Sequence, residues 1–178
     1  MNIPNTLTIL RVILIPFFVI FMLFDITDVD KYIALAIFIV ASLTDMLDGY
    51  LARKNHQVTN FGKFMDPLAD KLLVCTAIIC LMDLDKLPSL VVIIIIAREF
   101  IISGFRLVAS DNGVVIAASW WGKTKTVSQM FMIILLILDL GGMFATLETI
   151  LIYLSLILTI VSLGDYILKN KQVLSMQD

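Results

Sequence analysis

Apolar residues occupy six long stretches of this 178-residue chain, and short polar segments separate them. A helix needs roughly 20 mostly apolar residues to cross the hydrocarbon core of a bilayer, and each stretch is about that long. The six stretches and their short connections fill almost the whole chain. We therefore expect an all-α integral membrane protein that forms a single domain, residues 1–178. The six predicted transmembrane helices are Asn5–Phe24, Tyr32–Ala52, Phe61–Met82, Pro88–Ala109, Trp120–Leu140 and Ala145–Leu168.

The composition agrees with a membrane protein. Hydrophobic residues make up 60% of the chain and charged residues 16%, with a mean hydropathy of +1.01. Soluble domains have about 45–50% apolar and about 25% charged residues. The net charge is only −2, so no basic field is present to attract a nucleic acid, and we expect no nucleic-acid partner.

The lysines and arginines predict the orientation, because short cytoplasmic loops carry an excess of these residues. If both termini lie inside, eight of them fall on the inner side: Arg53, Lys54, Lys63, Arg106, Lys123, Lys125, Lys169 and Lys171. The outer loops then hold only Lys31 and Lys86. We expect this N-in, C-in, multi-pass topology. Because the compact chain lacks the features of a targeting segment, we also expect the cell (plasma) membrane.

One segment, residues 42–71, differs from the apolar stretches around it by its charged side chains, and we call it the acidic segment. It contains four aspartates, Asp45, Asp48, Asp66 and Asp70. Residues three or four apart share a helix face, and a short loop makes the second and third helices antiparallel. The four carboxylates should therefore converge at the cytoplasmic ends of these helices, where we expect the active site. A single aspartate there would be read as a solvated loop residue or a helix cap.

Four carboxylates so close together cannot all stay ionised without compensation, because like charges and a low dielectric both penalise the charged form. Divalent cations remove this conflict. Sites made of carboxylates suit Mg²⁺ or Mn²⁺, and two such ions form a clamp for phosphoryl chemistry. The segment thus predicts a site for two divalent cations.

The separations in this segment read Asp45-x2-Asp48-Gly49-x2-Ala52-Arg53-x8-Gly62-x3-Asp66-x3-Asp70. This pattern resembles the signature of the CDP-alcohol phosphatidyltransferase family. The resemblance implies a membrane enzyme that moves a substituted phosphate from a CDP-linked donor to an alcohol and releases CMP. It also implies two bound divalent cations and a homodimer.

The resemblance assigns roles to individual residues. Asp45, Asp48, Asp66 and Asp70 would bind the metals, and Asp70 would also be the general base. The residues implied to hold the CDP group are Thr8, Arg11, Asp48, Gly49, Ala52 and Arg53.

The second half of the chain carries its own charges inside apolar sequence. Arg98 follows four isoleucines, and Arg106 lies two helical turns later, so both can point the same way. One reading is that such residues snorkel to the interface and contact anionic lipid. An arginine this deep needs a partner, however, and a phosphate on the acceptor would serve. The candidate acceptor phosphate-binding residues are Lys63, Arg98, Arg106 and Lys125.

Three further motifs indicate the acceptor. They are "NIPNTLTILR", "AREFIISGFR" and "WGKTKTVSQ". They resemble motifs of family members whose donor is CDP-diacylglycerol, held with its tails in membrane lipid, and whose acceptor is sn-glycerol 3-phosphate. Two alternatives stay open: a family member with another acceptor, such as a cardiolipin or phosphatidylserine synthase, and a cation transporter. An ion path should reach the midplane or the far side of the membrane, whereas the outer halves of these helices are almost free of charge.

Overall fold

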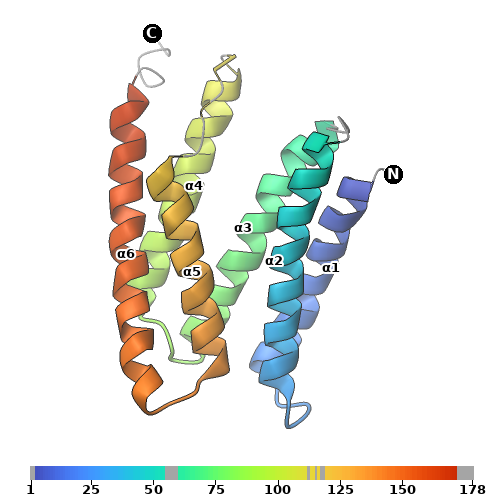
Figure 1. Cartoon of the computed structure of the whole chain (residues 1–178), viewed down its shortest axis with the longest axis vertical. Coiled ribbons are helices and arrows are strands. Elements are labelled where there is room, and N and C mark those ends of the chain that lie inside the picture. Colours follow the sequence, from blue (N-terminus) through green and yellow to red (C-terminus); the bar gives the residue numbers. More distant parts are fainter. Residues whose placement is uncertain (1–2, 55–59, 112, 115, 117–118, 172–178) are drawn as a thin grey trace. The chain divides into compact units, whose positions relative to one another are not determined.

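The chain folds into helices throughout the part that the structure describes. This computed structural model describes residues 3–54, 60–111, 113–114, 116 and 119–171, and the side chains of 3–5, 45–54, 60–67, 70 and 111 lie outside that description. The described residues form six α-helices and no strand (Figure 1). These are α1 (Ile3–Leu23), α2 (Asp30–Lys54), α3 (Asn60–Asp83), α4 (Ser89–Asp111), α5 (Trp120–Leu138) and α6 (Met143–Lys169).

Each helix coincides with a predicted apolar stretch, which confirms the all-α fold class. The helices end where the sequence offers local reasons to stop. Pro88 directly precedes α4, and its carbonyl accepts hydrogen bonds from the amides of Val91 and Val92. Between α5 and α6, Gly141 and Gly142 adopt φ angles of 65° and 55°, which side chains rarely allow.

Two of the described helices are both long and apolar enough to cross a membrane by themselves. The qualifying segments are Thr6–Leu23 of α1 and Met143–Lys169 of α6. The other four helices are 19 to 25 residues long. Six membrane crossings and the N-in, C-in orientation therefore stay predictions.

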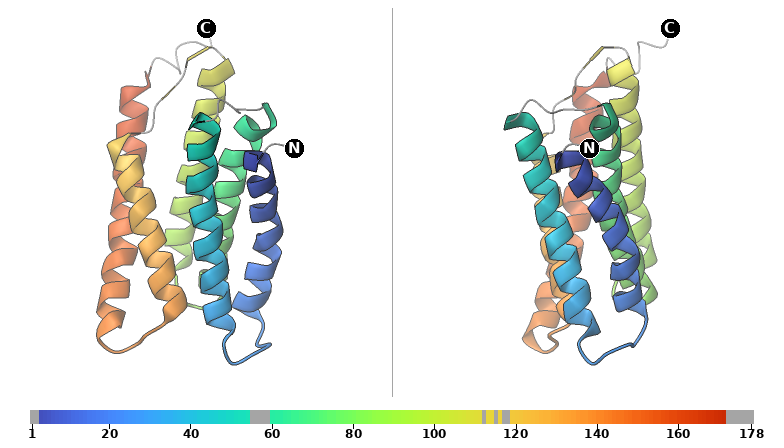
Figure 2. Two further views of the ribbon diagram at one scale, coloured as in Figure 1. Left: turned by 45° about the vertical axis from the view of Figure 1, so that its right-hand side comes forward. Right: turned by 90° about the vertical axis from the view of Figure 1, so that its right-hand side faces the viewer.

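The helices group into two compact units, residues 1–86 and 87–178. In the first unit α1 packs against both α2 and α3, and α2 also contacts α3 (Figure 2). Phe18 of α1 and Phe38 of α2 are fully buried, with ring centroids 6.1 Å apart. Small residues of α2, Ala34 and Ala41, are also fully buried, which lets α2 pack closely within this unit.

The turn between α1 and α2 is organised by Asp30. Its Oδ2 accepts hydrogen bonds from the amides of Ile26 and Thr27 at 2.5 and 2.8 Å, and its Oδ1 accepts one from the Thr27 hydroxyl at 2.5 Å. The hydroxyl bond from Thr27 lowers the pKa of Asp30 below its usual value. The carboxylate is thus ionised at neutral pH and ties the turn to the first residue of α2.

In the second unit α6 packs against both α4 and α5. One face of α6 carries a row of buried polar residues at helical spacing, namely Ser155, Thr159, Ser162 and Tyr166. The Ser155 hydroxyl lies 2.9 Å from that of Ser128 in α5, and the ring of Tyr166 meets Phe105 of α4 edge-on. Small hydroxyl residues let helices approach closely and hydrogen-bond across the contact. Polar contacts therefore connect α6 to both of its neighbours.

The pairing of Ser128 with Ser155 predicts a measurable coupling. In a double-mutant cycle with Ser128→Ala and Ser155→Ala, we expect a coupling of about 0.6 kcal/mol, the average for hydrogen bonds between membrane helices. The free energy of unfolding in mixed detergent micelles measures it. Fully additive effects would show that the two hydroxyls do not share a stabilising bond.

Candidate functional site

The acidic segment lies on two helices that contact each other. Residues 45 and 48 belong to α2 and residues 66 and 70 to α3, so each pair shares a helix face as the spacing predicted. Helices α2 and α3 pack together within the first unit. The side chains of the four aspartates lie outside the described residues, as do those of Gly49, Ala52, Arg53 and Lys63. Their convergence therefore stays a prediction.

No alternative metal site competes within the described part of the chain. There, no group of three or more histidine, cysteine, aspartate or glutamate side chains lies close enough together to hold an ion. Four carboxylates are the hard oxygen donors that Mg²⁺ and Mn²⁺ prefer. The aspartates of α2 and α3 thus remain the candidate ligands.

Arg11 of α1 lies beside the beginning of the acidic segment. It is fully buried, and its Nε donates to the carbonyl of Ala41 in α2 at 3.3 Å. The same carbonyl accepts a bond from the Thr44 hydroxyl at 2.7 Å. Ala41 precedes Asp45 by one helical turn. Thr8, also fully buried, precedes Arg11 by three residues, so it shares the same face of α1.

A buried group of charges joins α4 to α5 in the second unit. We call Arg98, Glu99 and Lys125 the cation cluster. The Glu99 carboxylate bonds Arg98 Nη1 at 2.9 Å, and its Oε1 also forms an ion pair with the Lys125 ammonium. Arg98 is 8% exposed and Lys125 2% exposed. One carboxylate thus bridges two cations that have little access to water, as buried charge requires.

The beginning of α5 lies next to Arg98. Ser119 caps the helix by accepting a hydrogen bond from the Gly122 amide at 3.1 Å. A methyl group on Gly122 would lie 3.5 Å from Arg98 Nη2 and 3.7 Å from Ser162 Oγ. Three helices therefore meet around this glycine. The amino-terminal end of α5 adds its partial positive charge to the two cations, which makes the region favourable for an anion.

Arg98 and Arg106 both contact α6, so they point the same way, as their spacing of two turns predicted. Arg98 Nη2 donates to Ser162 Oγ at 2.5 Å, while the guanidinium of Arg106 stacks over the Tyr166 ring, 5.9 Å from its centroid. Arg106 is exposed, unlike Arg98. The structure thus places Arg98 and Lys125 together, with Arg106 farther along the α4–α6 contact.

Two buried polar residues near the cation cluster were not singled out from the sequence. Ser162 of α6 contacts Arg98, and Gln129 of α5 lies one turn after Lys125 with 2% exposure. A signal for Ser162 exists, because Ser155, Thr159 and Ser162 recur at helical spacing in an otherwise apolar helix. The sequence of α6 does not predict which residues these side chains contact, because the contacts depend on how α6 packs against its neighbours.

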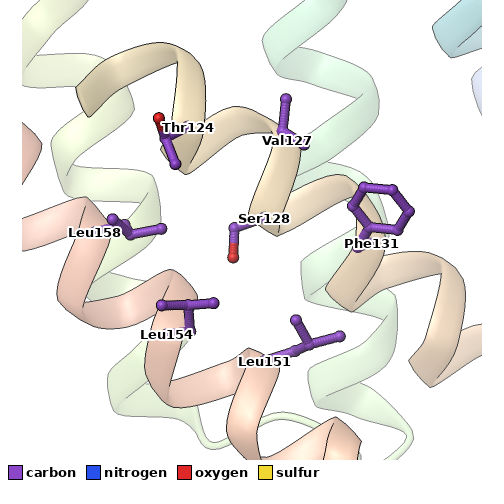
Figure 3. Close-up of a pocket in the computed structure, with 7 residues that line it drawn as sticks. All are labelled: Thr124, Val127, Ser128, Phe131, Leu151, Leu154 and Leu158. Atoms are coloured by element: carbon purple, nitrogen blue, oxygen red, sulfur yellow. The ribbon is translucent and has the colours of Figure 1, made fainter. Parts of the chain in front are cut away.

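A separate groove of about 410 Å³ lies between α5 and α6 (Figure 3). None of its seven lining residues is charged: Thr124, Val127, Ser128, Phe131, Leu151, Leu154 and Leu158. Such a surface has no group that could hold a metal or a phosphate by charge. The groove is therefore not the candidate site for phosphoryl chemistry.

Comparisons with known proteins agree on one family. Residues 1–161 match the family model described as CDP-alcohol phosphatidyltransferase. Proteins named CDP-diacylglycerol–glycerol-3-phosphate 3-phosphatidyltransferase are similar over most of the chain. The one from Bacillus subtilis (strain 168) is 43% identical over 190 aligned residues, covering 97% of each chain. The one from Haemophilus influenzae is 44% identical over 170 residues, covering 93% of this chain and 91% of the relative.

Glu99→Ala would leave two buried cations without their shared carboxylate. We expect it to lower the free energy of unfolding by about 3 kcal/mol, because breaking a buried ion pair from one side is strongly destabilising. Denaturation in mixed micelles measures this loss. The control is Asp165→Ala, which breaks the Lys169–Asp165 ion pair at 2.7 Å, in which Lys169 is largely exposed. Equal losses in both variants would contradict the bridging role of Glu99.

Proposed function

This chain belongs to the CDP-alcohol phosphatidyltransferase family, and from that membership we propose that it transfers the phosphatidyl group of CDP-diacylglycerol to sn-glycerol 3-phosphate. The products are phosphatidylglycerophosphate and CMP, and the reaction belongs to phospholipid biosynthesis. The observation that carries the proposal is the near full-length similarity to relatives that bear this activity in their names. The enzyme is thus a CDP-diacylglycerol-dependent phosphatidyltransferase.

The acceptor follows from the cation cluster. Arg98 and Lys125 are buried together beside the amino-terminal end of α5, where a phosphate is favourable. Arginine offers planar paired contacts to phosphate oxygens, and lysine contributes a compact charge. Arg106 and Lys63 complete the proposed acceptor set. Cardiolipin and phosphatidylserine synthases use other acceptors, and serine, which has no phosphate, would leave the two cations with less compensation.

The donor is held by the first unit. Arg11 and Thr8 lie buried on one face of α1. Arg11 donates a hydrogen bond to the carbonyl of Ala41, which lies one helical turn before Asp45. We assign the cytidine diphosphate to this face together with Asp48, Gly49, Ala52 and Arg53. The acyl chains of the donor stay in the surrounding lipid.

Members of this family use divalent cations, and the four aspartates of α2 and α3 have the right donor chemistry to hold two of them, Mg²⁺ or Mn²⁺. Bound cations would neutralise charge on the diphosphate and on the leaving group. Asp70 accepts the proton of the acceptor's 1-hydroxyl. The acceptor oxygen forms a bond to the phosphorus that carries diacylglycerol, the bond from that phosphorus to the CMP oxygen breaks, and CMP leaves.

We place the enzyme in the cell membrane with six crossings, both termini inside and the active site facing the cytoplasm. The family and the two apolar helices α1 and α6 support a membrane location. The excess of lysine and arginine on one side supports the orientation. The family match runs across both units, which supports a single domain, residues 1–178. The homodimer rests on family resemblance alone.

The first test is CMP release by the purified protein in detergent with CDP-diacylglycerol and Mg²⁺ or Mn²⁺. Glycerol 3-phosphate, serine, inositol phosphate and phosphatidylglycerol are compared as acceptors. We expect release with glycerol 3-phosphate alone and its loss on chelation, with recovery when the ion is restored. Release only with another acceptor would keep the family chemistry and overturn the assignment of the acceptor.

Asp70→Asn tests the general base. The amide has nearly the same shape but cannot take up a proton, so we expect turnover to fall by about 10² or more. Binding of CDP-diacylglycerol, measured separately by titration, and the unfolding midpoint should change much less. A variant that keeps most of its turnover would remove Asp70 from this role.

A further inference from the structure

Ser162 reaches Arg98 from a different helix. Its hydroxyl is fully buried in α6 and accepts the 2.5 Å bond from Arg98 Nη2, although 64 residues separate the two in sequence. Glu99, by contrast, is the next residue to Arg98 in α4. The contact with Glu99 therefore fixes the guanidinium within its own helix, and the contact with Ser162 fixes it relative to α6.

The two contacts leave one edge of the guanidinium for a ligand. Nη1 is used by Glu99 and Nη2 by Ser162, while the buried Nε finds no partner among the described residues. An arginine side chain carries three nitrogens in one rigid plane, so fixing two of them also fixes the direction of the third. A buried donor without a partner is costly, and an anion would satisfy it.

Gly122 of α5 lies beside the same guanidinium. Gly122 adds no side chain near Arg98 Nη2 and Ser162 Oγ, and an alanine methyl there would make only ordinary contacts at 3.5 and 3.7 Å. The positive end of α5 begins at the same place. A fixed cation and a favourable helix end thus coincide beside Ser162.

We propose that Ser162 is a positioning residue of the acceptor site, whose hydroxyl holds the Arg98 guanidinium in the orientation that receives the acceptor phosphate. This inference rests on the proposed function, because it assigns the anion to the acceptor. A long, flexible side chain loses freedom when it binds a ligand, and holding it beforehand reduces that loss. Ser162 acts through Arg98 and takes no part in the bond changes.

The test is the effect of Ser162→Ala on the KM for glycerol 3-phosphate. Hydrogen bonds to charged groups are among the stronger ones, so we expect this KM to rise about tenfold. The kcat and the KM for CDP-diacylglycerol should stay unchanged. Ser162→Thr, which keeps the hydroxyl, should restore the KM of the wild type.

Ser155→Ala is the matched control. Ser155 lies two turns before Ser162 on the same face of α6, is equally buried and bonds Ser128 instead of Arg98. The loss of a buried hydroxyl is the same in both variants. We expect Ser155→Ala to leave both KM values unchanged, so an equal rise of the acceptor KM in the two alanine variants would overturn the proposal.

A double-mutant cycle between Ser162 and Arg98 shows whether Ser162 acts through Arg98. In an Arg98→Ala background, Ser162→Ala should raise the acceptor KM no further, because the group that it positions is gone. Independent, multiplying effects would overturn the proposal.

The failure of this inference differs from the failure of the proposed function. If the wild-type protein turns over only another acceptor, the assigned acceptor is wrong, and the role of Ser162 in receiving the phosphate of glycerol 3-phosphate is overturned with it. If it releases no CMP at all, the assigned activity fails, and with it the role of Ser162 in acceptor binding. Turnover of glycerol 3-phosphate with an unchanged KM in Ser162→Ala would overturn the positioning role alone.

Discussion

The structure depends on one constraint, which is that a charge inside an apolar helix bundle must have a partner. The cation cluster shows how this constraint arranges the second unit. Glu99 lies next to Arg98 in α4 and forms an ion pair with Lys125 in α5, so this single carboxylate links the two helices. Ser162 adds α6 through Arg98. Apolar side chains alone would pack these helices in many registers, whereas these bonds select one.

The first unit meets the same constraint by a different route. Arg11 has a backbone carbonyl of α2 as a hydrogen-bond partner, next to the segment with four aspartates. This bond positions the arginine across the contact between α1 and α2. In both units a buried arginine thus donates a hydrogen bond to a neighbouring helix, to a backbone carbonyl in the first unit and to a serine hydroxyl in the second.

Much of the fold could be predicted because helix positions follow from local sequence. Apolar stretches of about 20 residues, with proline or glycine beside them, indicated all six helices to within a few residues. The partners of buried charges were harder to predict. Glu99 points about 100° away from Arg98 on an ideal helix, yet both side chains are long enough to meet. The contact of Arg98 with Ser162 depends on how α4 packs on α6, so no local pattern could predict it. For the four aspartates the sequence is more informative than the structure. Their spacing is distinctive, while their side chains lie outside the described residues.

The sharing of one carboxylate between two cations has a consequence for selectivity. Arg98, Lys125 and Glu99 together leave one positive charge in surroundings where water cannot screen it well. A molecule that enters without a negative group gains nothing from this charge and loses its own hydration. The site then discriminates between ligands in two ways. It attracts an anionic ligand, and it penalises an uncharged competitor, which loses its hydration without gaining a charge interaction. Any inhibitor directed at this place would have to carry an anionic group of its own.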